Sequence, residues 1–496
     1  MEAAGSLCRQ CGRCCAVVEE GSHKRQSYHA DIVQVRQCAG IRQTSLIRAT
    51  GPRTFAQAQM IVSPMIRRLG TIFIWLLGWV FLFAGININE PYLISLRGLG
   101  GAALFILSIV VLISLIKRGY WHGRGIAGRL LILLWCLPSL SMLCAHTVFE
   151  VRKRNVLQTE AVRRRVLGQH FVVGYSSFAE VAPLAEKGLI AGVYIARHNI
   201  AGKPAETLKP EIAALQDRRR VAGLPPLIVA ADQEGGIVSH LSPPLSALPS
   251  LSTLADLPPN IRAKRAEDFG RIHGRELAAL GVNRDFAPVL DLRPESGRNR
   301  FDFNTLINRR AISDDPAVVT DIGLAYVRGL DAFNVGATVK HFPGLGRVRA
   351  DTHHFSADLD TSLSVLEASD WRPFREVLAG SKAQLMMGHV TLTAVDPDRP
   401  ASHSKRVVDG IIRQKWNYQG VIITDDLVMG AIYNHNICTA VVEALNAGVD
   451  LLLVAYDGSQ FYRIFACASD AFNQGKLDAA MLRDSAARLK RTLPSD

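Results

Sequence analysis

The sequence predicts an α/β protein in two parts, in which three transmembrane helices precede a barrel of eight parallel strands that alternate with helices. Two observations carry this prediction. Three uncharged segments of about 20 residues follow one another before residue 150, and that length suits a helix that crosses the hydrocarbon layer. From residue 170 onward, eight short β-rich runs alternate with longer helical stretches, which is typical of a (β/α)8 barrel. An open doubly wound sheet is the alternative, but no phosphate-cradling glycine-rich turn follows the first run.

The excess positive charge is confined to the first third of the chain. Of a formal net charge of +13, residues 1–165 hold 21 Lys and Arg against 7 Asp and Glu, whereas the remainder holds 36 against 37. Because the basic residues flank apolar segments, membrane topology accounts for them better than nucleic-acid binding does. No DNA- or RNA-binding motif is present, so no nucleic-acid partner is expected.

The first 64 residues have no periodic pattern that predicts a folded unit. Their one feature is a cysteine cluster, Cys8, Cys11, Cys14 and Cys15, with Cys38 further on. Such spacing can hold zinc or an iron–sulfur cluster. No second pair with ligand spacing follows, and a start at Met60 or Met65 would leave the cluster out. We therefore expect no metal site and no cofactor.

The predicted membrane anchor occupies residues 65–150. Its three spans are Leu69–Ile88, Gly98–Ile116 and Leu130–Phe149, with Trp and Tyr at several edges, as in interfacial belts. A cleaved signal peptide is a poor alternative, because three consecutive spans exceed its single apolar region. A basic linker, residues 151–168, then leads into the barrel domain, residues 169–496.

Orientation is balanced between two sets of charges. The basic loop after the second span favours the cytoplasm, which would place the barrel outside, on the periplasmic side of a bacterial-type inner membrane. The arginines that directly follow the third span favour the opposite orientation. The chemistry that the ionisable residues at the strand ends suggest, described below, favours a barrel outside the cytoplasm.

The eight predicted strands end in ionisable residues. The runs are His170–Tyr175, Ala191–Ala196, Leu227–Asp232, Asn283–Asp291, Gly336–Phe342, Gln384–Val390, Val421–Asp426 and Asp450–Ala455. Helices are expected between them, including Arg262–Leu280 and one that begins at Asp315-Pro316, an acidic N-cap with proline at the first turn. Active sites of such barrels lie at the carboxyl ends of the strands. The cysteines of this part, Cys438 and Cys467, are expected to be isolated buried thiols rather than a disulfide.

One loop concentrates the chemistry. Lys340 and His341 end a buried run, and Asp351 lies two residues before His353 in the turn that follows. An aspartate beside a histidine orients the imidazole and tunes its proton affinity. Asp425, at the end of another buried run, is costly to bury as a carboxylate unless it is paired or functional. A carboxylate that faces an Asp-supported His suits displacement at an acetal carbon.

Four motifs in residues 169–496 resemble those of a known family. Asp232-Gln233-Glu234-Gly235-Gly236 resembles D-x-E-G-G, and Val282–Asp291 resembles N-x-x-F-A-P-V-x-D. Lys340–Gly346 with Asp351-Thr352-His353 resembles K-H-F-P-G-H-G followed by D-[ST]-H, and Gly420–Met429 resembles a G-V-[IV]-x-[ST]-D-D-L-x-M strand. Together they resemble glycoside hydrolase family 3, specifically its single-domain β-N-acetylglucosaminidases (β-hexosaminidases), which act on cell-wall sugars.

The resemblance implies a role for each matching residue. Asp425 would be the nucleophile that forms a glycosyl–enzyme intermediate, and His353, oriented by Asp351, the general acid and base. The residues that would hold sugar hydroxyls are Asp232, Arg310, Lys340 and His341.

Three positions depart from the family pattern. The family commonly reads E-G-G-R-V-x-R and P-G-H-G, whereas this chain has Ile237, His240 and Leu345 at the Arg, Arg and His positions. A site built for hydrogen bonds discriminates through them, so these changes bear on substrate recognition before chemistry.

The function expected is a membrane-anchored retaining β-glycosidase, a β-N-acetylhexosaminidase that acts on peptidoglycan fragments or a related glycan. Its expected partners are a carbohydrate substrate and the membrane; the sequence indicates no oligomeric state. A catalytically silent sugar-binding barrel is one alternative, favoured by the three departures. A glycoside phosphorylase is another, because a histidine acid in place of a carboxylate removes charge repulsion against phosphate.

Overall fold

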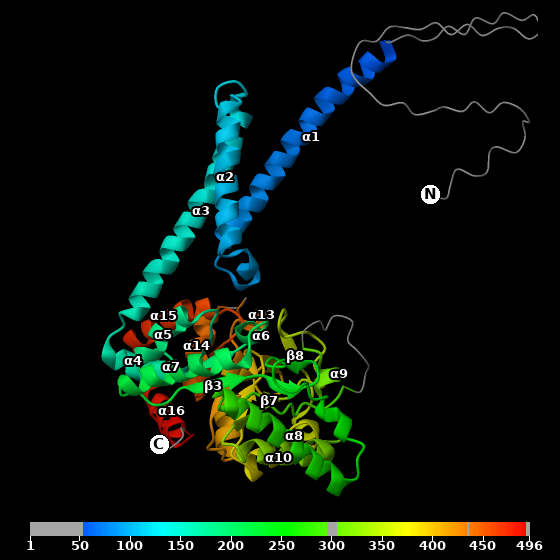
Figure 1. Cartoon of the computed structure of the whole chain (residues 1–496), viewed down its shortest axis with the longest axis vertical. Helices are drawn as coiled ribbons and strands as arrows, with labels where there is room; N and C mark the ends of the chain where they lie inside the picture. The colour runs from blue at the N-terminus through cyan, green and yellow to red at the C-terminus, as the bar shows by residue number, and fades with distance from the viewer. Residues whose placement is uncertain (1–52, 295–304, 434–435, 493–496) are drawn as a thin grey trace, which may run out of the picture. The chain divides into compact units, whose positions relative to one another are not determined.

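The barrel prediction is confirmed. The computed structural model describes residues 53–294, 305–433 and 436–492. Among these residues, eight parallel strands close in the order β1-β12-β11-β9-β7-β6-β3-β2, with helices around them (Figure 1). Each strand pairs with its neighbours in parallel, so all eight carboxyl ends meet at one face of the barrel.

Each strand of the barrel lies inside one of the eight predicted runs. The barrel strands are β1 Phe171–Gly174, β2 Gly192–Ile195, β3 Ile228–Ala231, β6 Arg284–Asp285, β7 Gly336–Phe342, β9 Gln384–Met387, β11 Ile422–Asp426 and β12 Leu451–Val454. Side chains alternate between two apolar clusters: Val172 faces the barrel interior, whereas Phe171 and Val173 pack outward on the helices. Because both faces are buried, the strands read as continuous apolar runs.

Two short sheets lie outside the barrel. The strand β4 Gln233–Gly235 pairs antiparallel with β5 Val238–Ser239, directly after β3. The strand β8 Ala357–Leu359 pairs in parallel with β10 Val390–Leu392. Both sheets follow carboxyl ends of barrel strands, so they build the walls around the site described below.

Two of the helices that surround the strands begin or end at capping residues. Asp315 caps α10 Pro316–Asp331 by accepting from the Ala317 N–H at 2.8 Å, and α8 Pro259–Leu280 ends at Gly281, whose φ of 89° is left-handed. The other helices are α4 Ala161–Leu167, α5 Phe178–Glu186, α6 Arg197–Ile200, α7 Leu208–Val221, α9 Ile307–Arg310, α11 Leu363–Ala368, α12 Arg372–Gly380, α13 Gly430–Tyr433, α14 Ile437–Ala447, α15 Phe461–Asn473 and α16 Ala479–Thr492, with a π-helical segment at Arg406–Lys415.

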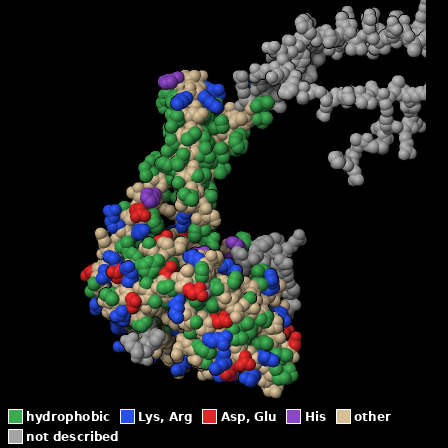
Figure 2. Space-filling view, viewed as in Figure 1, with side chains coloured by type: hydrophobic (Ala, Val, Ile, Leu, Met, Phe, Trp, Pro, Cys, Tyr) green, Lys and Arg blue, Asp and Glu red, His purple; other side chains and the backbone are tan. Residues whose placement is uncertain are grey.

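Three long apolar helices precede the barrel: α1 Arg53–Ile86, α2 Leu99–Lys117 and α3 Gly125–Leu157. Within the described residues, Arg68–Ile86, Leu99–Lys117 and Gly125–Leu157 are long and apolar enough to cross a membrane. Figure 2 shows hydrophobic side chains gathered over this helical segment, whereas acidic and basic side chains are scattered over the barrel. Such an exposed apolar surface indicates a lipid or protein environment.

The division of the chain into compact units falls within α1. One unit ends at Gly70, and its described part is the beginning of α1; the other unit, Thr71–Asp496, contains α2, α3 and the barrel. Residues 151–168, expected to be a linker, are largely helical, because α3 continues to Leu157 and α4 follows.

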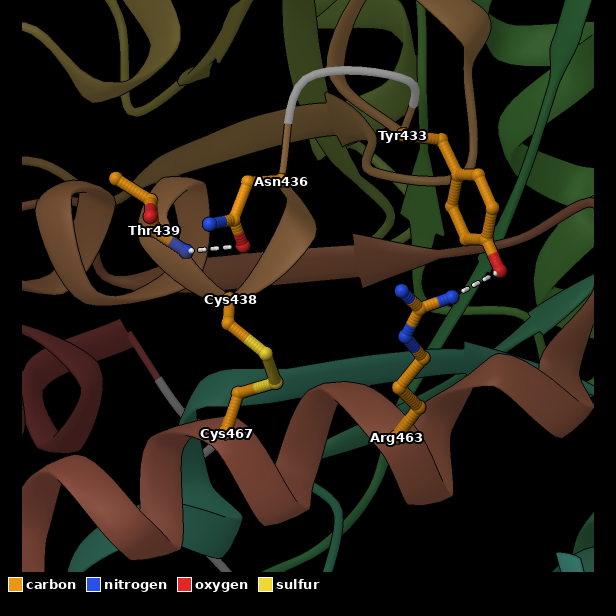
Figure 3. Close-up of a disulfide and its surroundings, with 6 residues drawn as sticks. All are labelled: Tyr433, Asn436, Cys438, Thr439, Arg463 and Cys467. Carbon is orange, nitrogen blue, oxygen red and sulfur yellow. Dashed lines mark hydrogen bonds between the residues drawn. A yellow bond between two sulfur atoms is a disulfide. The ribbon is translucent and has the colours of Figure 1, made fainter.

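The prediction for the two late cysteines is wrong. Cys438 on α14 and Cys467 on α15 form a disulfide, with Cα atoms 5.1 Å apart (Figure 3). Their separation of 29 residues hides the pairing from the sequence, because it arises only when two adjacent barrel helices pack side by side. The cluster Cys8, Cys11, Cys14 and Cys15, with Cys38, lies outside the described residues.

Candidate active site

The carboxyl end of β7 supplies two adjacent site residues. The pairing of β7 with β9 shifts register between Val339 and Phe342, so the regular alternation of faces is interrupted there. Lys340 and His341 are both buried, and both face polar partners from other strand ends. Regular strand geometry would have sent the two side chains to opposite faces.

Lys340 joins two carboxylates from the segment that follows β3. Its Nζ contacts Asp232, and it lies 2.6 Å from Glu234 Oε1. Arg310, at the end of α9, makes a two-point contact with the same Glu234, at 3.0 Å from Nε and 2.6 Å from Nη2. The result is a buried cluster of two cations and two anions.

This cluster holds its members in their charged forms. Burial alone would raise the pKa values of Asp232 and Glu234, but Lys340 pulls down the pKa of Asp232, and Arg310 with Lys340 pulls down that of Glu234. Burial would likewise lower the pKa of Lys340, which the two carboxylates instead raise. Fixed charges at a strand end are suited to binding several hydroxyl groups at once.

His341 is oriented by a carboxylate at the end of the predicted Asn283–Asp291 run. Its Nδ1 lies 2.7 Å from Asp291 Oδ2, which places the ring proton on Nδ1. The other nitrogen, Nε2, lies 3.3 Å from Arg310 Nη2 and accepts from it. Lys340, Arg310, His341 and Asp232 therefore meet in one place.

Asp425 lies near the end of β11, partly exposed at the mouth of the barrel. Burial would raise its pKa, but His341, His389 and His353 and a 2.8 Å hydrogen bond from the Asp426 N–H together bring the pKa below its ordinary value. The carboxylate is thus ionised near neutral pH without a direct cation partner among the described ion pairs. This is the state that a nucleophile requires.

Asp426, next in sequence, is held away from the mouth. Its carboxylate accepts from the N–H groups of Val428 at 3.0 Å, Ala455 at 3.0 Å and Tyr456 at 2.7 Å. Burial nevertheless raises its pKa to about 6. It ties β11 to the loop after β12.

His353 belongs to the loop after β7. Its Nδ1 lies 2.9 Å from Asp351 Oδ1, and Thr305 donates to the same oxygen at 2.9 Å. The Asp351 side chain is fully buried, whereas 38% of the His353 side chain is exposed. An imidazole held at Nδ1 leaves Nε2 free to exchange a proton with a bound molecule.

Two of the three residues that depart from the family pattern make polar contacts near the site. His240 lies on the polar cluster, because its Nδ1 is 2.9 Å from the Tyr194 hydroxyl, which donates to Asp232 at 2.6 Å. Leu345 is buried, and its backbone N–H donates to Asp291 at 2.8 Å. Ile237 has no polar side-chain atom to add.

The prediction of site residues omits Glu234, Tyr194 and Thr305. Glu234 stands in the motif that begins at Asp232, so its position was visible, but its bond to Arg310 spans 76 residues. Tyr194 lies at the end of β2, one position before its last residue, where it reads as an ordinary apolar strand residue. Thr305 carries no sequence signal at all.

The arrangement can supply a nucleophile and a proton donor to one bound molecule. The described residues contain no group of three or more His, Cys, Asp or Glu side chains with metal-site geometry. An ionised carboxylate and an imidazole at a mouth lined by hydrogen-bond donors and acceptors suit displacement at an acetal carbon.

Comparison with known proteins places the barrel in a family. Residues 164–492 match the glycosyl hydrolase family 3 N terminal domain. A β-hexosaminidase of Stenotrophomonas maltophilia (strain R551-3) is 34% identical over 289 residues, which are 58% of this chain and 82% of that protein. A β-hexosaminidase of Xylella fastidiosa (strain M23) is 35% identical over the same shares.

Solved structures agree with the sequence relatives. A glycoside hydrolase family 3 β-N-acetylglucosaminidase from Paenibacillus sp. str. FPU-7 superposes with a TM-score of 0.60 at 30% identity, over 66% of this chain and 61% of that one. A β-N-acetylhexosaminidase from Beutenbergia cavernae DSM 12333 gives 0.59 at 25% identity, over 68% and 98%. The segment before residue 164 has no counterpart in the family match.

Proposed function

This chain belongs to glycosyl hydrolase family 3 and is a glycoside hydrolase, and from that premise we propose that it is a retaining β-N-acetylhexosaminidase anchored in a membrane. The observation that carries the proposal is the ionised Asp425 at the barrel mouth, together with His353 held by Asp351. Its substrates are glycans with β-linked N-acetylhexosamine, such as peptidoglycan fragments. The named activities of the relatives support this class of sugar.

The mechanism assigns one role to each residue. A carboxylate oxygen of Asp425 attacks the anomeric carbon while the His353 Nε2–H protonates the departing glycosidic oxygen, which leaves a glycosyl–enzyme ester. His353, now neutral, takes a proton from water, which attacks the same carbon and frees Asp425. Two displacements at one carbon retain its configuration.

The charged cluster serves binding in this proposal. Asp232, Lys340, Arg310 and His341 hold sugar hydroxyls, and Glu234 holds Lys340 and Arg310 at their positions. Because Asp232 and Glu234 are ionised and held by Lys340, Arg310 and Tyr194 before substrate arrives, little reorganisation is needed on binding.

The location proposed is a bacterial-type inner membrane crossed by α1, α2 and α3, with the barrel on the periplasmic side. Two observations support this side. Lys117 ends α2, and Arg118 and Arg124 lie between α2 and α3, on the side opposite to the barrel in a three-span arrangement. The Cys438–Cys467 disulfide is typical of proteins in oxidising compartments.

The proposal is tested on the full-length protein in detergent with nitrophenyl β-glycosides. We expect release of nitrophenol from the β-N-acetylglucosaminide at a far higher kcat/KM than from the β-glucoside, with retention of configuration in the first sugar product seen by NMR. Phosphate is varied in parallel. No release under any condition would favour a silent sugar-binding barrel, and a sugar phosphate as the product would favour a phosphorylase.

A further inference from the structure

The loop between α1 and α2, residues Asn87–Arg97, contacts the barrel at a distant point of the sequence. Arg97 reaches the loop after β12, where it lies 2.9 and 2.7 Å from the two carboxylate oxygens of Asp457 and donates to Ser459 at 2.7 Å. The same guanidinium donates to the carbonyls of Ile88, Asn89 and Glu90 at 2.7–3.0 Å. Asp457 is 2% exposed, so this two-point pair is buried on the barrel side.

A second group of contacts lies beside the first. Gln460 donates to the Asn89 carbonyl at 2.6 Å, and Arg463 lies 3.8 Å from Glu90. Arg463 also donates to the Tyr433 hydroxyl at 2.7 Å, as Figure 3 shows, and Tyr433 bonds to Gln460 at 2.9 Å. The Cys438–Cys467 disulfide links α14 to α15 four residues further along α15 from Arg463.

The first contact leads to the nucleophile. Asp457 directly follows Ala455 and Tyr456, whose N–H groups hold the Asp426 carboxylate at 3.0 and 2.7 Å. The N–H of Asp426 in turn donates to Asp425 Oδ1 at 2.8 Å. A shift of the loop after β12 would therefore move Asp426 and, with it, the N–H group that hydrogen-bonds to Asp425.

The second contact leads to the acid. Tyr433 ends α13, which begins at Gly430, and the Gly430 N–H donates to the His353 carbonyl at 2.8 Å. A Cβ at position 430 would lie 2.8 Å from the His354 carbonyl oxygen and 2.9 Å from that of His353, so α13 and the His353 loop are in direct backbone contact. Movement of α13 would displace His353.

We propose that the Asn87–Arg97 loop is a positioning element of the active site, with Arg97 as its main residue. It holds the loop after β12 and the end of α13 together, and through them it sets the geometry between Asp425 and His353. The helical segment is thus part of the catalytic unit as well as a membrane anchor. This inference rests on the proposed roles of Asp425 and His353, and it adds a residue that the family match does not cover.

The test compares variants of the full-length protein in detergent. Arg97→Ala is expected to lower kcat on the nitrophenyl β-N-acetylglucosaminide roughly 10- to 100-fold with KM changed less than about threefold, because small misplacement of reacting groups costs rate and not binding. The kcat of Arg97→Lys is expected to lie between those of the native protein and Arg97→Ala. Lysine keeps the charge but cannot hydrogen-bond to Asp457 and three carbonyls at the same time. Asp457→Asn should give a loss similar to that of Arg97→Ala, and the double variant no further loss.

Arg124→Ala is the matched control, because Arg124 lies in the connection between α2 and α3 and bonds Tyr120. Hydrogen exchange provides a readout independent of turnover: in Arg97→Ala the amides of Gly430, Ala455 and Tyr456 should exchange faster, and in Arg124→Ala they should not. Unchanged exchange at these amides in Arg97→Ala would overturn the proposal. So would a kcat within twofold of the native value, or an equal loss of kcat in Arg124→Ala.

Discussion

The two sides of the barrel mouth are built on opposite physical principles. On the proposed sugar-binding side, Lys340, Arg310, Asp232 and Glu234 neutralise one another in a buried cluster. On the proposed proton-transfer side, His353 is 38% exposed on a loop and has one carboxylate partner, Asp351. In the proposed mechanism the first side is fixed before substrate arrives, whereas His353 on the second side gives up and regains a proton in every turnover. Buried charged groups that are already paired suit substrate binding, whereas a partly exposed imidazole suits proton exchange.

The largest effect is expected from Asp425→Ala. We predict a loss of turnover of at least about 10⁴-fold with the fold unchanged, because nothing nearby replaces the nucleophile. Hydrolysis of the nitrophenyl β-N-acetylglucosaminide and circular dichroism check the two halves of the prediction. A variant near the native rate would place the nucleophile elsewhere.

His353→Ala sharpens the comparison, because its effect should depend on the leaving group. General acid catalysis typically contributes ~10²–10⁴-fold, and a nitrophenyl group needs little of it. We therefore expect a large loss on an unactivated oligosaccharide and a much smaller loss in the glycosylation step of the aryl substrate. Asp351→Asn should act in the same direction but more weakly, because it removes orientation and not the proton donor.

His354→Ala is the control for that series. His354 is exposed and packs edge-on against Phe355, and we expect only a minor change in rate. Equal losses from His353→Ala on both substrates, or a larger loss from His354→Ala, would mean that another residue is the acid.

Glu234→Ala tests the binding side. Removing the shared carboxylate leaves Lys340 and Arg310 buried and facing each other, and breaking a buried ion pair costs about 3–5 kcal/mol. We expect a lower denaturation midpoint and a raised KM in Glu234→Ala. Glu234→Gln keeps the shape of the side chain, so both changes should be smaller. Native stability in Glu234→Ala would show that water compensates the two cations.

The last prediction concerns the pH dependence of stability and a buried carboxylate, Asp285, that has no direct cation partner among the described ion pairs. Burial raises the pKa of Asp285 to about 8, although the Gln233 N–H and the Tyr326 hydroxyl donate to it. Because the folded pKa exceeds the unfolded value, its stabilising contribution is full below about pH 4 and is lost as the pH rises through about 8. Asp285→Asn should remove this slope and be the more stable form above pH 8. Melting temperatures of the native protein and Asp285→Asn between pH 4 and 9 check this prediction. Parallel curves of melting temperature against pH for the two proteins would refute it.

Much of the architecture was readable from the sequence. The eight strands are continuous apolar runs because both faces of a closed parallel barrel are buried, and the three long helices are uncharged over about 20 residues each. Polar residues at the ends of buried runs predicted where the site would form, because parallel strands bring those ends together. Asp315 predicted the start of α10 by local capping chemistry alone.

Only the tertiary structure decided which polar groups meet. Lys340 and His341 lie in one cluster because the register of β7 is irregular, which the alternation of residues along the strand does not predict. The pairs Arg310–Glu234, Cys438–Cys467 and Arg97–Asp457 join residues 76, 29 and 360 positions apart. Hydrophobic periodicity is a local property that short stretches of sequence carry, whereas these contacts arise only when distant elements have packed.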